Sequence, residues 1–133
     1  MIVGVGIDLV DVARVERLLA GKGDRSLARL CTEREAVYVR SRFGGAATFA
    51  VRIAAKEAAY KALAGTEDAR RIGWREIEVI GTENGPPRLE LHGLAKRRAE
   101  ELGVVHIHVS LTHTATSAGA VVVLEGQPEA GSR

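Results

Sequence analysis

Lysine and glutamate residues near the middle of the chain carry the groups that phosphate chemistry needs. Lys56, Glu57 and Lys61 lie in an alanine-rich stretch, and the four-residue separation of Glu57 and Lys61 places both on one face of a helix. A carboxylate there can hold a divalent cation, while the two ammonium groups neutralise phosphate. The same spacing also describes an exposed helix ion pair worth about 0.3–0.5 kcal/mol, so spacing alone leaves both interpretations open.

The metal interpretation requires a further acidic residue, because Mg²⁺ is typically held by one or two protein carboxylates together with water and phosphate oxygens. Asp8 is the candidate. It ends the apolar stretch at residues 2–8, where a carboxylate is costly unless it is paired or coordinated. The alternative is that Asp8 caps the following helix, although Asp11 is better placed for that role.

A third candidate segment, residues 110–114, ends a predicted strand. Hydroxyl groups on Ser110 and Thr112, the imidazole of His113 and the amides of the following turn can together hold an anion. Ser and Thr are also common near strand ends, and a single His is usually structural. Ser110 is not part of a Gly-x-Ser-x-Gly pattern, which argues against a hydrolase. The other histidines lack the spacing of a zinc site.

These candidates depend on a few secondary-structure elements for their placement. Gly4 and Gly6 alternate with β-branched residues, which predicts a strand that another backbone or a ligand approaches closely. Thr32 and Glu35 fit a capping box, and Gly103 is a helix C-cap. The longest helix is expected over residues 46–64. The other expected elements are helices over 12–20 (ended by Gly21 and Gly23), 27–31, 33–42 and 94–102, and strands over 74–80, 88–92, 104–112 and 118–124, with Val105, Ile107, Val109 and Leu111 on one face.

The pattern predicts an α+β protein with one domain at residues 1–125, in which a mainly antiparallel sheet packs against the long helix. Residues 126–133 read as a disordered tail. The helices are too few to cover all the strands, which favours an oligomer. A single cysteine, Cys31, excludes a disulfide framework and is expected to be buried. The sequence has neither a membrane-length apolar run nor a signal peptide, so we expect a cytoplasmic protein without a membrane partner.

Positive charge is concentrated in the first half of the chain. Residues 13–52 contain nine basic and four acidic side chains, a net charge of +5, whereas the whole chain carries +2. Such a region can face nucleic acid, an anionic cofactor or an acidic protein, and charge alone does not choose among them.

Three segments together resemble one family. Residues 4–8 (Gly-Val-Gly-Ile-Asp), 52–61 (Arg-Ile-Ala-Ala-Lys-Glu-Ala-Ala-Tyr-Lys) and 108–114 (His-Val-Ser-Leu-Thr-His-Thr) are similar in order and spacing to segments of the holo-[acyl-carrier-protein] synthases, the small trimeric class of 4′-phosphopantetheinyl transferases. The resemblance covers about residues 1–125 and implies the fold of those transferases. It also implies transfer of phosphopantetheine from coenzyme A to a serine of apo acyl carrier protein, with release of adenosine 3′,5′-bisphosphate, in fatty acid or polyketide biosynthesis.

The resemblance also implies roles for individual residues. Asp8 and Glu57 match magnesium ligands, and Glu57 is the residue expected to take the serine proton. Lys61 matches a lysine on the coenzyme A phosphates, with Lys56 beside it. Ser110, Thr112 and His113 match the nucleotide site, and Arg14 matches a contact to the acidic carrier protein. The family is a homotrimer with active sites between adjacent subunits. This chain departs from the usual pattern at Ile53, at residues 62–66 and at Pro86.

Two other functions compete with the enzyme. A non-catalytic anion-binding trimer that regulates a partner predicts the loss of Asp8, Glu57 or Lys61, yet all three are present. An RNA-binding protein would use the arginine-rich half, but Phe43 and Phe49 are not arranged as a stacking platform. We therefore expect no nucleic-acid partner.

Overall fold

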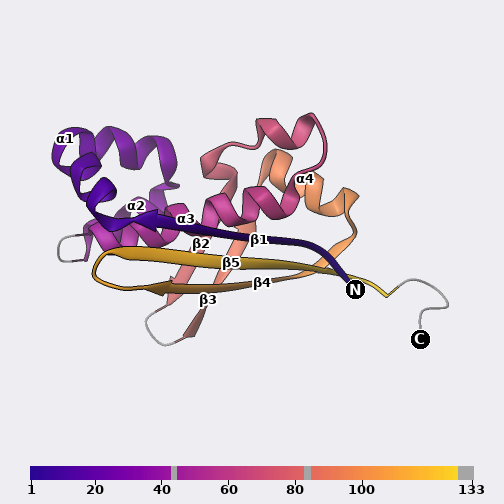
Figure 1. Ribbon diagram of the computed structural model, residues 1–133. Coiled ribbons are helices and arrows are strands. Elements are labelled where there is room, and N and C mark those ends of the chain that lie inside the picture. Colours follow the sequence, from indigo (N-terminus) through magenta and orange to yellow (C-terminus); the bar gives the residue numbers. More distant parts are fainter. Residues whose placement is uncertain (43–44, 83–84, 129–133) are drawn as a thin grey trace.

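The computed structural model describes residues 1–42, 45–82 and 85–128 of the chain (Figure 1). Its elements are β1 (Ile2–Asp11), α1 (Val12–Leu30), α2 (Glu33–Arg40), α3 (Ala46–Leu63), the 3₁₀ helices η1 (Asp68–Arg71) and η2 (Trp74–Glu76), β2 (Ile77–Thr82), β3 (Gly85–Leu91), α4 (Gly93–Glu101), β4 (Val104–His113) and β5 (Ser117–Gly126). An antiparallel sheet has the order β1-β5-β4, and β2 and β3 form a separate antiparallel hairpin. This is the predicted α+β class.

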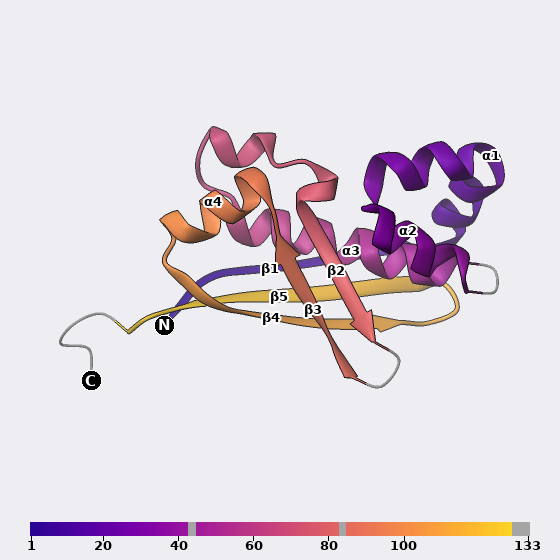
Figure 2. The same cartoon turned by 180° about the vertical axis from the view of Figure 1, so that it is seen from behind.

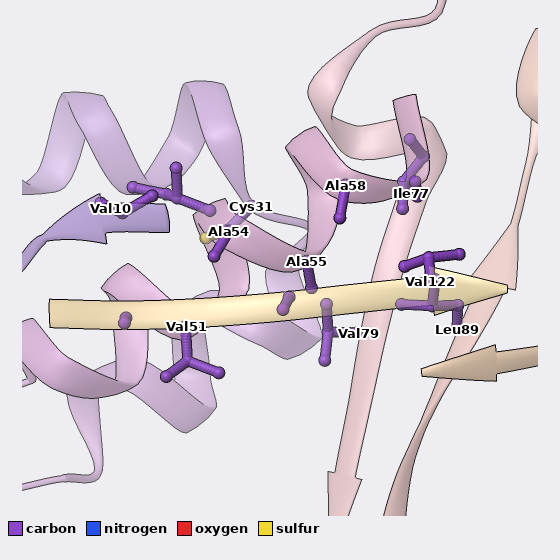
Figure 3. Close-up of a cluster of buried hydrophobic side chains, with 14 of the residues drawn as sticks. Val10, Cys31, Val51, Ala54, Ala55, Ala58, Ile77, Val79, Leu89 and Val122 are labelled. Carbon is purple, nitrogen blue, oxygen red and sulfur yellow. The ribbon is translucent and has the colours of Figure 1, made fainter. Parts of the chain in front are cut away.

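The helices lie on one side of the three-stranded sheet, and α3 packs directly on β1 and β5 (Figures 1 and 2). The hairpin lies beside α3 and β4, and together they enclose a core of small aliphatic residues (Figure 3). Val122 of β5, Ala54 of α3 and Val79 of the hairpin are at most 3% exposed in that core. Cys31 is buried at its edge, as predicted. In the described part of the chain, no helix is both long and apolar enough to cross a bilayer.

Two glycines in β1 explain how closely α3 approaches the sheet. A Cβ atom at Gly6 would overlap the carbonyl oxygen of Ala58, and one at Gly4 would overlap that of Ala62. The prediction that another backbone approaches these glycines is therefore confirmed, and the neighbour is the long helix itself. Asp8 is two residues beyond Gly6, so it shares the face of β1 that meets α3.

The opposite face of the sheet is apolar along β1. Val5, Ile7 and Leu9 are 57%, 65% and 73% exposed, because the helices cover only the other face. Val105 was expected to share one face of β4 with Ile107, Val109 and Leu111, but it is exposed, whereas they are partly buried. The pairing with β5 shifts register between Val104 and His106, so Val105 is an extra residue in β4. This bulge reverses the alternation of side chains between the two faces at that point.

The structure confirms some of the predicted helix starts and ends and corrects others. The capping box of α2 forms, since Thr32 and Glu35 bond each other's backbone N–H groups. Gly103 follows α4 with a φ of +72°, the left-handed conformation expected of a helix C-cap. Asp11 occupies the N-cap position of α1 but makes no side-chain cap bond. The first helix does not end at its glycines: a kink at Lys22 absorbs the break and the helix continues to Leu30.

The chain ends were also predicted with mixed success. Gly126 was assigned to the tail, yet it is the last residue of β5, and its N–H donates to the Met1 carbonyl at 2.7 Å. The rest of the predicted tail includes residues 129–133, which lie outside the described residues. Residues 74–76 were expected to open a strand but form η2 instead, because the Glu76 carboxylate accepts from the Gly73 N–H at 2.7 Å and tightens the turn.

Candidate active site

The structure brings Asp8, Glu57 and Lys61 together at the contact between β1 and α3. The Lys61 ammonium donates to Asp8 Oδ1 at 3.0 Å and to the Ile7 carbonyl at 3.1 Å. The carboxyl groups of Asp8 and Glu57 interact with each other, and this interaction shifts the pKa of both. The side chain of Asp8 is 15% exposed, whereas that of Lys61 is 56% exposed, so the cluster has a sheltered base and an open rim.

The two carboxyl groups have opposite pKa shifts. Burial, and then the hydrogen bond and negative charge of Asp8, raise the pKa of Glu57 to about 7. Burial also acts to raise the pKa of Asp8, but the hydrogen bonds with Glu57 and Lys61 outweigh it and hold this pKa below its ordinary value. Asp8 is therefore ionised at neutral pH, while Glu57 exchanges its proton in that range.

The donor set fits a divalent cation. Asp8 Oδ2 is buried and has no hydrogen-bond partner among the described residues. A buried carboxylate oxygen without a donor is costly, and two adjacent carboxyl groups resist double ionisation. A cation bound by Asp8 and Glu57 would relieve both costs, and hard oxygen ligands of this kind suit Mg²⁺.

A cavity of 480 Å³ opens beside Glu57 and Lys61. One wall comes from α3, including Tyr60, and the other comes from the segment around η2, including Ile72 and Trp74. Charged side chains, including Lys61 and Arg70, and apolar side chains both line it, so the cavity suits a ligand with an anionic part and an apolar part. Ile72 and Trp74 were not among the predicted site residues, because the segment around η2 is remote from α3 in sequence and carries no motif.

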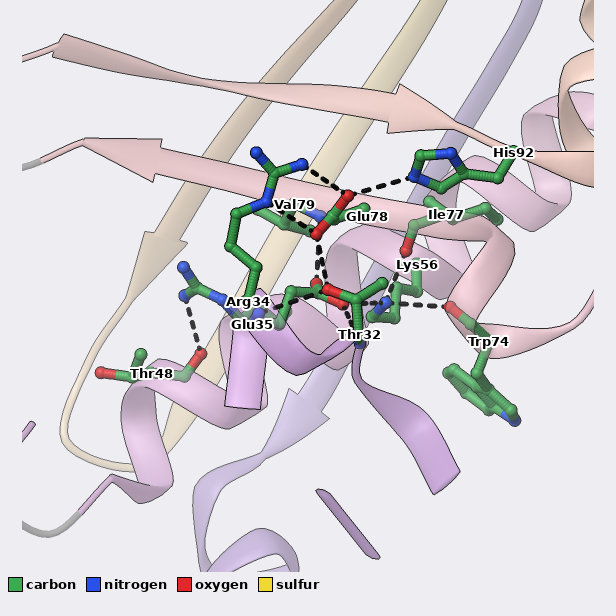
Figure 4. Close-up of polar contacts among 11 residues, drawn as sticks. Thr32, Arg34, Glu35, Thr48, Lys56, Trp74, Ile77, Glu78, Val79 and His92 are labelled. Carbon is green, nitrogen blue, oxygen red and sulfur yellow. Dashed lines mark hydrogen bonds and ion pairs between the residues drawn. The ribbon is translucent and has the colours of Figure 1, made fainter. Parts of the chain in front are cut away.

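Lys56 does not contact phosphate in this arrangement, which corrects the prediction. Its side chain is 1% exposed, and its ammonium donates to Glu35 Oε1 at 2.7 Å, to the Trp74 carbonyl at 2.9 Å and to the Ile77 carbonyl (Figure 4). All three N–H donors are therefore used inside the protein. The sequence offered one signal: most residues of α3 are alanine or another apolar type, which is typical of a helix that is buried on most sides.

Ser110 and Thr112 lie away from the carboxyl groups. Cross-strand partners share a face, and these two residues align through β5 with Ile7 and Leu9 on the uncovered face of the sheet. His113, at the end of β4, lines a separate cavity of 630 Å³ beside the start of α3. His113 therefore lines a different cavity from Glu57 and Lys61, and Ser110 and Thr112 lie on the other face of the sheet from Asp8.

Arg14 is exposed on the first turns of α1, at the edge of the acidic cluster. Its charge acts on Glu57, where it opposes the rise in pKa that burial and Asp8 cause. This position allows Arg14 to face a macromolecular substrate that approaches the cluster from solvent.

A second group of possible metal ligands lies on the hairpin but is already neutralised. Single oxygen or nitrogen atoms of Glu78, Glu90 and His92 lie within 4.8 Å of one another. The Arg34 guanidinium contacts Glu78 at 2.9 Å and Glu90 at 3.5 Å, and Thr32 donates to Glu78 at 2.6 Å. The hydrogen bond from Arg34 is the largest cause that lowers the pKa of Glu78 to about 2. This cluster is an ion-pair network between α2 and the hairpin.

Comparison with known proteins gives a consistent result. The sequence matches the family described as the 4′-phosphopantetheinyl transferase superfamily over residues 4–122. A holo-[acyl-carrier-protein] synthase of Alkalilimnicola ehrlichii is 48% identical over 126 residues, which cover 94% of this chain and 98% of the relative. The structure of a holo-[acyl-carrier-protein] synthase from Neisseria meningitidis matches with a TM-score of 0.80 at 27% identity, covering 94% of this chain and 99% of that one. The synthase from Bacillus anthracis in complex with CoA (3′,5′-ADP) matches with a TM-score of 0.75 at 32% identity, covering 96% and 99%.

The fold, the carboxyl pair and the match over most of the sequence agree, and the chain belongs to the 4′-phosphopantetheinyl transferase superfamily. The relatives that it matches within that superfamily are holo-[acyl-carrier-protein] synthases. The family expected from the three sequence segments is thereby confirmed, and so is the α+β fold that the resemblance implied.

Proposed function

We propose that the chain transfers 4′-phosphopantetheine from coenzyme A to a serine of apo acyl carrier protein, with release of adenosine 3′,5′-bisphosphate. The observation that carries the proposal is the cluster of Asp8, Glu57 and Lys61, of which Glu57 and Lys61 line the 480 Å³ cavity. The printed names of the relatives and the coenzyme A complex of the Bacillus anthracis protein support it. The intact mass of apo acyl carrier protein after incubation with the enzyme, coenzyme A and MgCl₂ tests it.

The residues of the cluster divide the chemistry between them. The serine Oγ forms a bond to the phosphorus next to pantetheine, and the bond from that phosphorus to the bridging oxygen breaks. Glu57 accepts the serine proton, for which a pKa of about 7 suits a base at neutral pH. Lys61 stabilises the negative charge on the departing phosphate. Asp8 and Glu57 would hold Mg²⁺, which supplies positive charge to the pyrophosphate when bound.

Mg²⁺ binding to this cluster should weaken as the solution becomes acidic. Below pH 7 a proton occupies Glu57 and competes with the cation. We expect Mg²⁺ to bind about tenfold more weakly at pH 6 than at pH 8. Calorimetric titration with MgCl₂ at the two pH values measures this ratio, and Glu57→Gln should abolish the pH dependence along with most of the affinity. Equal affinities at pH 6 and pH 8 would contradict the assignment.

The active form is a homotrimer with active sites between adjacent subunits. The exposed apolar row of Val5, Ile7 and Leu9 supports this assembly, because a monomer would leave that row in water. Ser110 and Thr112 lie on the same uncovered face, where a neighbouring subunit could complete a nucleotide site that one subunit does not form.

His113 contributes to coenzyme A binding from the 630 Å³ cavity. The first turn of α3 lines this cavity, and its N-cap residue, Gly45, offers no side chain to the free N–H groups there. These amides and the imidazole suit a phosphate group.

Arg14 recognises the carrier protein, whose acidic surface suits the +5 segment of the chain. We expect Arg14→Ala to raise KM for the carrier protein about tenfold and to leave the affinity for coenzyme A nearly unchanged. Transfer kinetics at varied carrier concentration measure the first effect, and calorimetry measures the second. Arg29→Ala is the matched control, because Arg29 is also exposed on α1 but lies in its last turn. Equal losses for both substrates would place Arg14 in the coenzyme A site instead.

The carrier protein that accepts phosphopantetheine serves fatty acid or polyketide biosynthesis. The reaction takes place in the cytoplasm, where coenzyme A and the carrier protein are both present. The names of the relatives support the acceptor class.

A further inference from the structure

A buried ion pair that the proposed chemistry does not use joins α2 to α3. The side chains of Lys56 and Glu35 are 1% and 0% exposed, and the Lys56 ammonium lies 2.7 Å from Glu35 Oε1. Glu35 also accepts from the Thr32 N–H at 2.9 Å and from the Val79 N–H at 3.0 Å. The pair therefore links α2, α3 and β2 through one set of bonds (Figure 4).

The remaining donors of Lys56 hold the wall of the 480 Å³ cavity. They bond the carbonyl groups of Trp74, the first residue of η2, and of Ile77, the residue that follows η2. Both residues line the cavity. On the opposite wall is Glu57, the next residue of α3. Lys56 thus spans the distance between the helix that carries the acidic cluster and the segment that faces it.

The irregular backbone at η2 explains why a charged pair stands here rather than two apolar residues. Buried carbonyl groups require donors, and a 3₁₀ turn followed by a strand edge leaves the Trp74 and Ile77 carbonyls without partners in a regular ladder. A lysine supplies donors to both, and its buried charge is tolerable only beside a carboxylate such as Glu35. Packing alone would not fix the position of this segment in the same way.

We propose that Lys56 and Glu35 are positioning residues that set the width of the cavity and, through it, the affinity for the pantetheine arm of coenzyme A. The inference rests on the proposed function for the identity of the ligand. The arm is elongated and uncharged beyond its phosphate, which matches a cavity that both cationic side chains, such as Lys61, and apolar side chains, such as Ile72 and Trp74, line.

Trp74 is the only tryptophan in the chain, so its fluorescence reports the position of this wall directly. The test variant is Lys56→Met with Glu35→Gln, which removes both charges and leaves no lone buried carboxylate. Without coenzyme A, we expect its Trp74 emission to shift to longer wavelength and acrylamide quenching to increase. Leu27→Ala is the control, because Leu27 is buried in α1 but does not line the cavity.

Kinetics then separate positioning from a merely structural role. We expect KM for coenzyme A to rise about tenfold in the double variant while kcat changes by less than about threefold, because the lost interaction serves ground state and transition state alike. Leu27→Ala should lower the melting temperature without moving KM. A folded double variant with wild-type KM and wild-type Trp74 emission would overturn the proposal.

A measurement on the unmodified protein covers the case in which the double variant does not fold. Saturating coenzyme A should protect Trp74 from acrylamide, and unchanged quenching in a protein that binds coenzyme A would overturn the assignment of the arm to this cavity. A wild-type protein that neither binds coenzyme A nor transfers its phosphopantetheine would refute the proposed function. The Trp74 shift in the double variant would still decide whether the ion pair holds the wall.

Discussion

Replacing Glu57 with glutamine should reduce phosphopantetheine transfer by about 10³-fold, because the change removes both a metal-binding carboxylate and the group that accepts the serine proton. The fold should survive. Glutamine has nearly the volume of glutamate, and its neutral amide removes the repulsion between the half-buried Glu57 and Asp8, which contributes to the raised pKa of Glu57. The variant should therefore melt at the wild-type temperature or above it at pH 8.

Transfer rates at saturating coenzyme A and carrier protein measure the first effect, and circular dichroism melts measure the second. Glu67→Gln makes the same chemical change at a side chain that is 88% exposed and should leave the rate unaltered. A Glu57→Gln enzyme that keeps more than about a tenth of its activity would refute both roles assigned to the carboxylate.

The second large effect concerns stability. Gly6→Ala places a methyl group where the Ala58 carbonyl oxygen lies, and that oxygen belongs to the backbone of a buried helix that has little room to move. We expect a loss of about 4 kcal/mol or more in the free energy of unfolding, at the severe end of single substitutions. Any folded fraction should also have weak activity, since α3 carries Glu57 and Lys61 away from Asp8 as it shifts.

Gly21→Ala is the matched control for this substitution. Gly21 lies within α1 and a Cβ there meets no atom within 4 Å, so alanine should be neutral or stabilising by about 0.5–1 kcal/mol. Urea denaturation of both variants gives the comparison. Wild-type stability of Gly6→Ala would mean that α3 does not pack on β1 as closely as described.

The parts of the fold that short-range patterns determine could be predicted from the sequence. Alternating glycines in β1 indicated the close approach of another backbone, and the residues of the Thr32 capping box indicated the start of α2. The capping box depends on groups only three residues apart, and the glycine pattern depends only on the absence of a side chain. Residue types and spacing made Asp8 and Glu57 candidate metal ligands but left an ordinary surface ion pair of Glu57 and Lys61 open, and the family resemblance decided between the two interpretations.

Other features depend on partners far away in the chain, and no local pattern contains them. Lys56 was predicted to bind phosphate, but its ammonium donates hydrogen bonds to Glu35 and to the Trp74 and Ile77 carbonyls instead. These acceptors come from other elements of the fold. The extra residue at Val105 depends on the register with β5. The opposite faces of Ser110 and His113 follow from their three-residue spacing, but which of those faces the helices cover depends on how α3 packs on the sheet.

The most direct test of the central claim is the intact mass of apo acyl carrier protein after incubation with this protein, coenzyme A and MgCl₂. The account predicts a gain equal to one phosphopantetheine group, which a chelator prevents and excess Mg²⁺ restores. Asp8→Asn and Glu57→Gln should give little or no gain under the same conditions. A carrier protein of unchanged mass, tested with an enzyme that binds coenzyme A, would contradict the account, and so would full modification by either variant.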